Sequence, residues 1–341
     1  MNAGTRMFRE ASAAPDAVRS QLITNRDVVG ELARALRHDP PRAVVTCARG
    51  SSDHAATYAR YLIETRTGVL TSSASPSVSS LYAARTDLAS VLFLAISQSG
   101  ASPDLLSAAR AAKGEGARVV ALVNAEGSPL ARIAHHVIPL CAGAESSVAA
   151  TKSFIASLAG IVHLVGSWMQ DDELQASLAC LPELLARAWQ LDWSAAIEPL
   201  RTAGSLFVVG RGLGLGIAQE AALKFKETCG LHAEAFSSAE LRHGPIALAG
   251  RAFPVLAFAQ QDEARADVEA LAAELAGLGA RVMLAGSTVN GTVALPALRA
   301  HPALEPLLLI QSFYRLVDAL AAVLGRDPDR PPNLRKVTET V

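Results

Sequence analysis

Apolar residues recur along the chain in two alternating patterns. Short runs of consecutive apolar residues predict buried strands, and each run is followed by a small-residue loop and a stretch with helical spacing. In the first half of the chain the predicted strands are residues 43–47, 91–96, 118–124 and 137–140, and the predicted helices run to residue 65 and over 103–113 and 151–168. A strand, loop and helix in this order form a βα unit, so this half predicts a parallel sheet covered by helices.

The same order begins again after residue 204. The predicted strands are residues 205–210, 253–259 and 281–285, and the predicted helices are 215–229, 262–278 and 306–324. We therefore expect an α/β protein of two tandem doubly wound parallel sheets, each a flavodoxin-like three-layer αβα module with right-handed connections. The predicted domains are a leader of one or two helices (1–40), module 1 (41–170), a helical connection (171–204), module 2 (205–325) and a C-terminal tail (326–341).

Composition narrows the classes of partner. The 341 residues include 31 Lys and Arg against 32 Asp and Glu, so no excess charge favours nucleic acid or a membrane surface. No basic start leads into an apolar run, and no uninterrupted apolar stretch of about 18 residues indicates a membrane span, which predicts a cytoplasmic protein. The four cysteines lie far apart, and we expect buried free thiols rather than a zinc site or disulfides.

Hydroxyl side chains gather in loops that follow predicted strands. The loop at residues 97–102 carries three serines and precedes a helix, so hydroxyls and backbone N–H groups there can form a cradle for a phosphate. The alternative is an ordinary capping loop, because Ser102 before Pro103 is a good N-cap by itself. The candidate phosphate ligands are Ser51, Ser52, Ser97, Ser99, Ser102 and Thr151. Since the GxxxxGK[ST] motif is absent, we expect a sugar phosphate rather than ATP.

A glycine-rich loop at residues 208–216 matches a dinucleotide fingerprint only loosely. The GxGxxG spacing would need glycine at position 215, 217 or 219, where the chain has Leu, Ile and Gln. A dinucleotide-dependent oxidoreductase is therefore disfavoured, and we expect neither a cofactor nor a metal.

Three charged residues lie on one side of the predicted helix 215–229. Glu220, Lys224 and Glu227 are spaced by four and then three residues, and the rest of the helix is largely Ala, Leu and Phe. The pattern is suggestive of a site that moves protons. The alternative is a solvated face with an i,i+4 ion pair.

One histidine has a setting that suits chemistry. His243 is followed by Gly244 and Pro245, so it lies in a turn from which it can project into a cleft and transfer protons near neutral pH. The other histidines that we considered, which we interpret as structural, are His135, His136 and His301.

Six segments carry a family resemblance. They are residues 97–100 (SQSG), 149–152 (AATK), 220–227 (EAALKFKE), 232–235 (HAEA), 240–245 (ELRHGP) and 333–336 (NLRK). In that order they resemble the isomerase half of glucosamine-6-phosphate synthase and the glutaminase-lacking glucosamine-6-phosphate deaminases, which belong to the SIS (sugar isomerase) domain family. The chain departs from the synthase motifs at Ala101 and Ala150, where the synthase has Glu and Ser.

The resemblance implies a role for each matching residue. The residues implied to hold the phosphate and the sugar hydroxyls are Ser52, Ser97, Gln98, Ser99 and Ser102. Glu227 is implied to move a proton between C2 and C1, with Lys224 beside it. His243, supplied by the neighbouring subunit of a homodimer with shared active sites, is implied to open the pyranose ring, and Lys336 to close over the substrate.

The resemblance also implies a reaction. Residues 1–40 leave no room before module 1 for a glutaminase domain, so we expect a deaminase that converts glucosamine 6-phosphate to fructose 6-phosphate and ammonia. Plain aldose–ketose isomerisation, or deglycation of a fructosamine phosphate, would use the same base and cradle. A sugar-phosphate sensor without turnover is the alternative of another class. The presence of both Glu227 and His243 favours an enzyme, and the leader contains no basic helix-turn-helix.

Overall fold

The structure, a computed structural model, describes residues 4–334 and residue 336, and they form two compact units. The first-sheet unit comprises residues 16–145, 152–179 and 336, and the second-sheet unit comprises residues 4–15, 146–151 and 180–334. The predicted domains follow one another along the chain, whereas these units interleave. The predicted boundaries stay a prediction.

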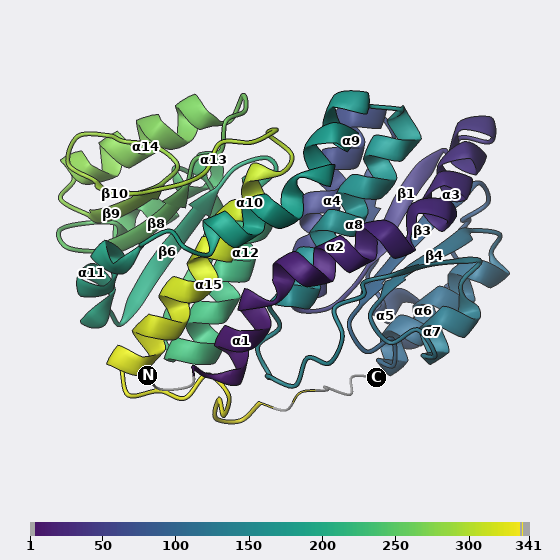
Figure 1. Cartoon of the computed structure of the whole chain (residues 1–341), viewed down its shortest axis with the longest axis horizontal. Coiled ribbons are helices and arrows are strands. Elements are labelled where there is room, and N and C mark those ends of the chain that lie inside the picture. The colour runs from purple at the N-terminus through teal and green to yellow at the C-terminus, as the bar shows by residue number, and fades with distance from the viewer. Residues whose placement is uncertain (1–3, 335, 337–341) are drawn as a thin grey trace. The chain divides into compact units, whose positions relative to one another are not determined.

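The first-sheet unit contains a five-stranded parallel sheet with strand order β2-β1-β3-β4-β5. Its strands are β1 (Ala43–Cys47), β2 (Thr71–Ser73), β3 (Val91–Ser97), β4 (Arg118–Val123) and β5 (His136–Pro139). The helices that pack on one face are α3 (Arg26–His38), α4 (Ser51–Thr67) and α8 (Lys152–Met169), and those on the other are α5 (Ser77–Ser80), α6 (Pro103–Gly114) and α7 (Pro129–Ile133) (Figure 1). A further helix of this unit, α9 (Asp172–Ala179), packs on α8.

The second-sheet unit repeats the plan with strand order β10-β9-β8-β6-β7, again all parallel. Its strands are β6 (Ser205–Gly210), β7 (His232–Ser237), β8 (Pro254–Phe258), β9 (Arg281–Ala285) and β10 (Val293–Leu295). The helices α13 (Ser238–Leu241) and α14 (Arg265–Gly277) cover one face. The helices gathered on the other are α1 (Arg6–Ser12), α10 (Leu181–Ala188), α11 (Ile197–Arg201), α12 (Gly214–Lys224) and α15 (Glu305–Val323) (Figure 1).

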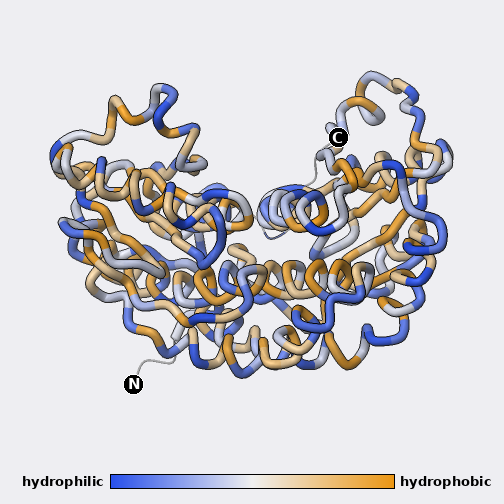
Figure 2. Tube along the Cα trace, turned by 90° about the horizontal axis from the view of Figure 1, so that it is seen from above, coloured by the Kyte–Doolittle hydropathy of each residue, from blue (hydrophilic) through white to orange (hydrophobic). Residues whose placement is uncertain are grey.

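Continuous apolar strands explain why both sheets are covered on two faces. All seven residues of β3 and all five of β8 are buried, as expected of parallel strands between two helical layers. In Figure 2 the helical segments alternate between hydrophobic and hydrophilic colour along the tube, which is the pattern of helices with one buried face. The predicted fold class, two tandem three-layer α/β modules, is confirmed.

Three strands that the sequence did not predict, β2, β7 and β10, lie at the edges of the two sheets. Their sequences are TSS, HAEAFS and VAL. An edge strand has a neighbour on one side only, so it needs no long apolar run. Short edge strands therefore escape a search that relies on hydrophobic continuity.

The leader contains three helices, where one or two were predicted. They are α1, α2 (Ala14–Thr24) and α3. Pro15 does not break a helix, because it lies in the first turn of α2, where its missing N–H is not needed. Asn25 separates α2 from α3.

The cysteines are free among the described residues, but not all of them are buried. Cys47 and Cys229 are buried, and burial raises the pKa of the Cys47 thiol to about 12. Cys141 is half-buried and Cys180 is exposed, so the prediction of buried thiols is wrong for these two.

Two helices are long and apolar enough to cross a membrane by length and composition alone. They are α8 and α15, and 89% and 72% of their most apolar windows are buried inside the protein. A helix that is buried in the core of a protein meets the same criteria of length and composition.

His163 on α8 makes the stability of the first-sheet unit sensitive to acid. Burial, with Arg26 nearby, lowers the pKa of His163 to about 4. The unfolded chain binds a proton near pH 6.5, so stability falls as the pH falls from 6.5 towards 4, by about 2 kcal/mol between pH 7 and pH 5. We expect His163→Leu to remove this loss, as measured by urea unfolding at both pH values. His232→Leu, which changes an exposed histidine, is the control. If His163→Leu lost as much stability between pH 7 and pH 5 as the wild type, other groups would cause that loss.

Candidate functional site

Two hydroxyl-rich loops follow neighbouring strands of the first sheet, at the carboxyl ends of these strands. Strands β1 and β3 are paired in parallel, with Cys47 opposite Ala95, so the loops that follow them emerge side by side. Ser51 and Ser52 begin α4 after the first loop, and Ser97 ends β3 before the second. The carboxyl ends of parallel strands are where such folds bind ligands, and the role of these serines as phosphate ligands stays a prediction.

The loop at residues 97–102 contains a glycine at which any side chain would be strained and would crowd its neighbours. Gly100 has φ +60°, and a Cβ there would lie 2.7 Å from the Ser128 Cβ. Its N–H donates a hydrogen bond of 2.9 Å to the Ser97 hydroxyl, and the N–H of Ala101 donates one of 3.4 Å to the Ser99 hydroxyl. Both hydroxyls accept from the backbone, so each keeps its own proton to donate to a ligand.

Ser102 occupies the N-cap position of α6, but its side chain makes no capping hydrogen bond. The structure thus agrees with the capping-loop alternative on the position of Ser102 but not on a capping bond from its side chain, and its role as a phosphate ligand stays a prediction. Gln98 is half-buried, and its backbone carbonyl accepts a hydrogen bond from the backbone N–H of Ala125.

An ion pair joins the loop after β1 to the start of α6. Arg49 in the loop after β1 donates from Nε to the Asp104 carboxylate over 2.8 Å, and a second guanidinium nitrogen lies 2.7 Å from the same oxygen. Asp104 is buried in the first turn of α6, whereas half of the Arg49 side chain is exposed. The Asp104 carboxylate thus fixes the position of the half-exposed Arg49 guanidinium.

Thr151 belongs to the second-sheet unit, directly before α8, and is wholly buried. The structure therefore does not bring it together with the serines within one unit. Its predicted role as a phosphate ligand stays a prediction.

A buried chain of charges lies on α12 and the turn that follows it. The Lys224 ammonium lies 3.2 Å from the Glu220 carboxylate and 2.6 Å from that of Glu227. Glu220 and Lys224 have no exposed side-chain surface, and Glu227 keeps 17%. The Tyr314 hydroxyl on α15 donates to Glu220 over 3.2 Å. The alternative of a solvated helix face is therefore wrong.

The two carboxylates keep Lys224 charged. Burial alone would lower its pKa, but Glu220 and Glu227 outweigh burial and raise the pKa above its ordinary value. Lys224 is thus an ammonium at neutral pH, and it presents a fixed positive charge to Glu227.

Glu227 lies on η2 (Phe225–Cys229), a π-helical turn that continues α12. The predicted helix 215–229 therefore changes its winding at residue 225, and Gly230 ends it with φ +66°. A π-helical turn is less stable than an α-helical one and is commonly found at functional sites. Here it places Glu227 at the partly exposed end of the charged chain.

His243 is exposed on the second-sheet unit, between α13 and η3 (Pro245–Leu248). The backbone N–H of His243 donates a hydrogen bond to the backbone carbonyl of Glu240. Gly244 follows with φ +135°. The exposed imidazole is accessible to another subunit. Its role in ring opening stays a prediction.

Lys336 contacts a carboxylate that the sequence did not single out. Its ammonium lies 3.5 Å from the Glu145 carboxylate, which is wholly buried. Glu145 also accepts a hydrogen bond of 2.6 Å from the Ser153 hydroxyl and one from the Ser153 N–H. The only sequence signal for Glu145 is its position just before the serine pair at residues 146–147.

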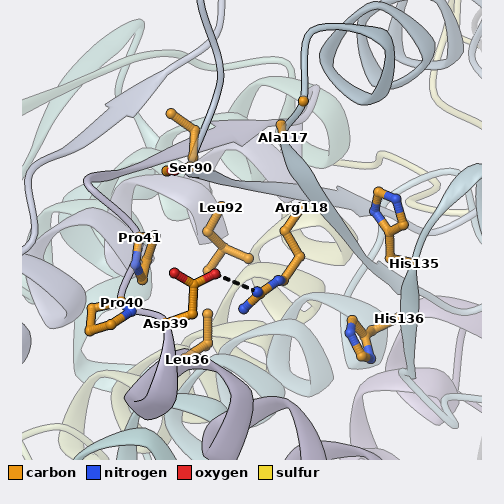
Figure 3. A pocket seen from close by; sticks show the side chains of 12 residues that line it. Leu36, Asp39, Pro40, Pro41, Ser90, Leu92, Ala117, Arg118, His135 and His136 are labelled. Carbon is orange, nitrogen blue, oxygen red and sulfur yellow. Dashed lines mark hydrogen bonds and ion pairs between the residues drawn. The ribbon is translucent and has the colours of Figure 1, made fainter.

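A cavity of about 400 Å³, shown in Figure 3, lies at the end of the first sheet opposite the serine loops. Arg118 pairs there with Asp39 over 3.0 Å, and both His135 and His136 line the wall. The His135 Nδ1 accepts a hydrogen bond from the Val119 N–H. Burial and neighbouring positive charges lower the pKa of both histidines. This cavity lies at the amino ends of the strands, away from the serine loops.

Fold and site together define a two-module α/β protein with a hydroxyl-lined edge on one sheet and a buried carboxylate–lysine chain beside the other. The SIS domain family model matches residues 39–165 and 199–301, and the chain belongs to this family.

Named relatives share the architecture. The chain is 36% identical over 308 residues to a glutamine–fructose-6-phosphate aminotransferase (isomerizing) from Aeropyrum pernix, covering 84% of this chain and 49% of that protein. The chain thus spans about half the length of the curated relatives that it matches. A crystal structure from Silicibacter pomeroyi DSS-3, described as a phosphosugar isomerase, is 45% identical with a TM-score of 0.92, covering 95% of this chain and all of that one. The C-terminal domain of glucosamine-fructose-6-phosphate aminotransferase from Francisella tularensis is 25% identical with a TM-score of 0.88, covering 97% and 99%.

Proposed function

We propose that the protein is an amino-sugar phosphate isomerase/deaminase that converts glucosamine 6-phosphate to fructose 6-phosphate and ammonia. The observation that supports this most is the buried Lys224 ammonium, 2.6 Å from a Glu227 carboxylate that is itself partly exposed. A base for proton transfer at carbon must be ionised, held still and within reach of the substrate. The ion pair with Lys224 holds the Glu227 carboxylate in place, and its partly exposed side chain supports access by a substrate.

The proposed reaction moves one proton between adjacent carbons. Glu227 takes the proton from C2 of the open-chain sugar, and the electrons form a C1=C2 double bond. The C1 carbonyl oxygen becomes a hydroxyl by taking the proton that the substrate's ammonium group gives up. The same carboxyl returns a proton to C1, which leaves a C2=N imine. Water adds to C2, and the C2–N bond breaks to release ammonia and fructose 6-phosphate. One group acts as base and then as acid, so no redox step is involved.

The other residues bind and orient the substrate. In this proposal Ser97, Ser99 and Ser102 donate hydroxyl protons to the phosphate, with Arg49 adding charge at the same edge. Lys336 covers the sugar from the C-terminal tail, and its buried partner Glu145 positions it. The neighbouring subunit of a homodimer supplies His243, whose exposure supports this part of the proposal.

Purified protein should release ammonia and fructose 6-phosphate in equal amounts from glucosamine 6-phosphate without glutamine. Unphosphorylated glucosamine should react far more slowly, because the serine loop recognises the phosphate. Ser97→Ala should raise KM by about tenfold or more with a smaller change in kcat, since it removes a donor from the cradle. Enzyme-coupled detection of both products measures this.

Ser79→Ala, a change outside the serine loops, is the control for Ser97→Ala. Tight binding of glucosamine 6-phosphate by calorimetry with no product would favour the sensor instead. Conversion to a ketose with the nitrogen retained would favour a plain isomerase. Either result would contradict the proposed deaminase.

A further inference from the structure

The carboxylate of Glu10, on α1, binds the backbone of the segment that follows Glu145. One of its oxygens accepts hydrogen bonds from the Ser146 N–H over 2.6 Å and from the Ser146 hydroxyl over 3.1 Å. The other oxygen accepts a hydrogen bond of 3.2 Å from the Ser147 N–H. Glu10, Ser146 and Ser147 all belong to the second-sheet unit. Charge-assisted hydrogen bonds are stronger than those between neutral groups, so Glu10 fixes the backbone at residues 146 and 147.

Glu145 is thereby held at both its backbone and its side chain. Consecutive Cα atoms lie about 3.8 Å apart, so a backbone that is fixed at Ser146 leaves the backbone of Glu145 little freedom. The Glu145 carboxylate accepts hydrogen bonds of 2.6 Å from the Ser153 hydroxyl and 3.2 Å from the Ser153 N–H. Its side chain is wholly buried. The backbone is thus held through Glu10, and the side chain through Ser153.

The position of the Lys336 ammonium depends on Glu145. The two charged groups lie 3.5 Å apart, and 26% of the Lys336 side chain is exposed. Separating such a pair is costly, because the buried carboxylate would remain without water or a positive charge around it. The ammonium therefore stays where the Glu145 carboxylate is held.

The start of α1 also binds the segment that leads to Lys336. The Asp329 carboxylate accepts hydrogen bonds from the N–H groups of Arg6, over 2.6 Å, and of Met7, over 3.0 Å. The Arg6 guanidinium donates to the Asp329 carbonyl over 3.2 Å. The first N–H groups of a helix have no partner within it, and Asp329 supplies one for two of them. Helix α1 therefore contacts both the segment after Glu145 and the segment before Lys336.

We propose that Glu10 is a positioning residue for catalysis, which acts through Glu145 on the place of the Lys336 ammonium. The inference rests on the proposed function, because it takes Lys336 to act on the sugar phosphate. Glu10 itself does not touch the substrate in this proposal. The serine loops bind the phosphate whether or not Lys336 is in place, so the loss of Glu10 affects kcat rather than KM.

Kinetics of Glu10 variants test the effect on turnover. Glu10→Ala should lower kcat for glucosamine 6-phosphate by about tenfold to a hundredfold, because a misplaced group reacts slowly. KM should change by less than about threefold. Glu10→Gln keeps an oxygen that accepts from Ser146, so it should retain most of the activity. Glu31→Ala, which removes an exposed glutamate from α3, is the matched control and should keep the wild-type kcat.

A double variant distinguishes positioning from a general structural role. Glu10→Ala/Lys336→Ala should be no slower than Lys336→Ala alone, because Glu10 acts through Lys336. A double variant that is much slower than Lys336→Ala would overturn the inference. Thermal unfolding checks that each variant is folded at the assay temperature. Glu10→Asp, whose shorter side chain moves the carboxylate away from Ser146, gives the same comparison if Glu10→Ala does not fold.

Acetylation of Lys336 tests its position without any turnover. The purified protein is treated with the N-hydroxysuccinimide ester of acetic acid, and peptide mass spectrometry follows Lys336 against the exposed Lys226 as internal reference. An ammonium held by a carboxylate reacts slowly, so Glu10→Ala and Glu145→Gln should each raise the rate at Lys336 by about threefold or more. Glu10→Gln and Glu31→Ala should keep the wild-type rate.

The acetylation rates separate this inference from the proposed function. An unchanged rate at Lys336 in Glu10→Ala would overturn the inference, whatever the kinetics show. If the wild type does not convert glucosamine 6-phosphate, the proposed function fails. A faster acetylation in Glu10→Ala would then still show that Glu10 positions Lys336.

Discussion

For the proposed deaminase we expect Glu227→Gln to lower kcat for glucosamine 6-phosphate by between about a hundredfold and ten thousandfold, and to leave the Kd for the sugar phosphate within about threefold. The amide has the shape of the carboxylate but cannot take a proton from carbon. In the proposed function the binding groups are the serine loops, which belong to the first-sheet unit, so we expect binding not to depend on this charge. Steady-state kinetics with calorimetry separates the two effects.

Glu198→Gln is the matched control, because Glu198 is an exposed glutamate of the same unit. It should keep the wild-type kcat. Turnover by Glu227→Gln at the wild-type rate would show that another group is the base. A large loss of binding would show that Glu227 acts mainly in recognition.

Lys224→Met lowers the free energy of unfolding by about 3–5 kcal/mol, the largest loss that we expect from one charged residue. The substitution leaves Glu220, wholly buried, and Glu227 without the ammonium that compensates them. The apolar methionine offers neither a charge nor a hydrogen bond. Urea unfolding followed by tryptophan fluorescence measures the loss, since Trp189 and Trp193 lie in the same unit.

The double variant Glu220→Gln/Lys224→Met should regain part of that stability, because it removes one of the two uncompensated charges. The surface pair of Arg201 and Glu198, at 3.0 Å, provides the control. Arg201→Met should cost less than about 1 kcal/mol, since water solvates an exposed partner. Equal losses in Lys224→Met and Arg201→Met would contradict the importance of burial.

Local sequence patterns were enough to predict the fold. Every central strand is mostly apolar, and such runs, followed by helical spacing, occur in β1, β3, β4, β6, β8 and β9. Burial on both faces demands this pattern from a parallel strand. An edge strand does not need a continuous apolar run. The sequence pattern therefore did not predict the edge strands β2, β7 and β10.

The candidate site was predictable only in part. Spacing placed Glu220, Lys224 and Glu227 on one side of a helix, but it did not distinguish a solvated face from a buried one. Only the packing of α15 against α12, which brings Tyr314 to Glu220, shows that the charges are buried. Whether a helix face is buried depends on the element that packs against it. Here Tyr314 on α15 lies about ninety residues along the chain from Glu220 on α12.

The sequence by itself determined the two-module α/β architecture, the serine loop after β3 and the family to which the chain belongs. Each of these depends on neighbours in sequence, through hydrophobic periodicity, turn residues and short motifs. The tertiary structure alone decided the π-helical turn under Glu227, the contact of Lys336 with Glu145, and the hydrogen bonds of Glu10 to residues 146 and 147. These features join segments far apart in the chain, and the free energy that places them comes from packing that no local pattern encodes.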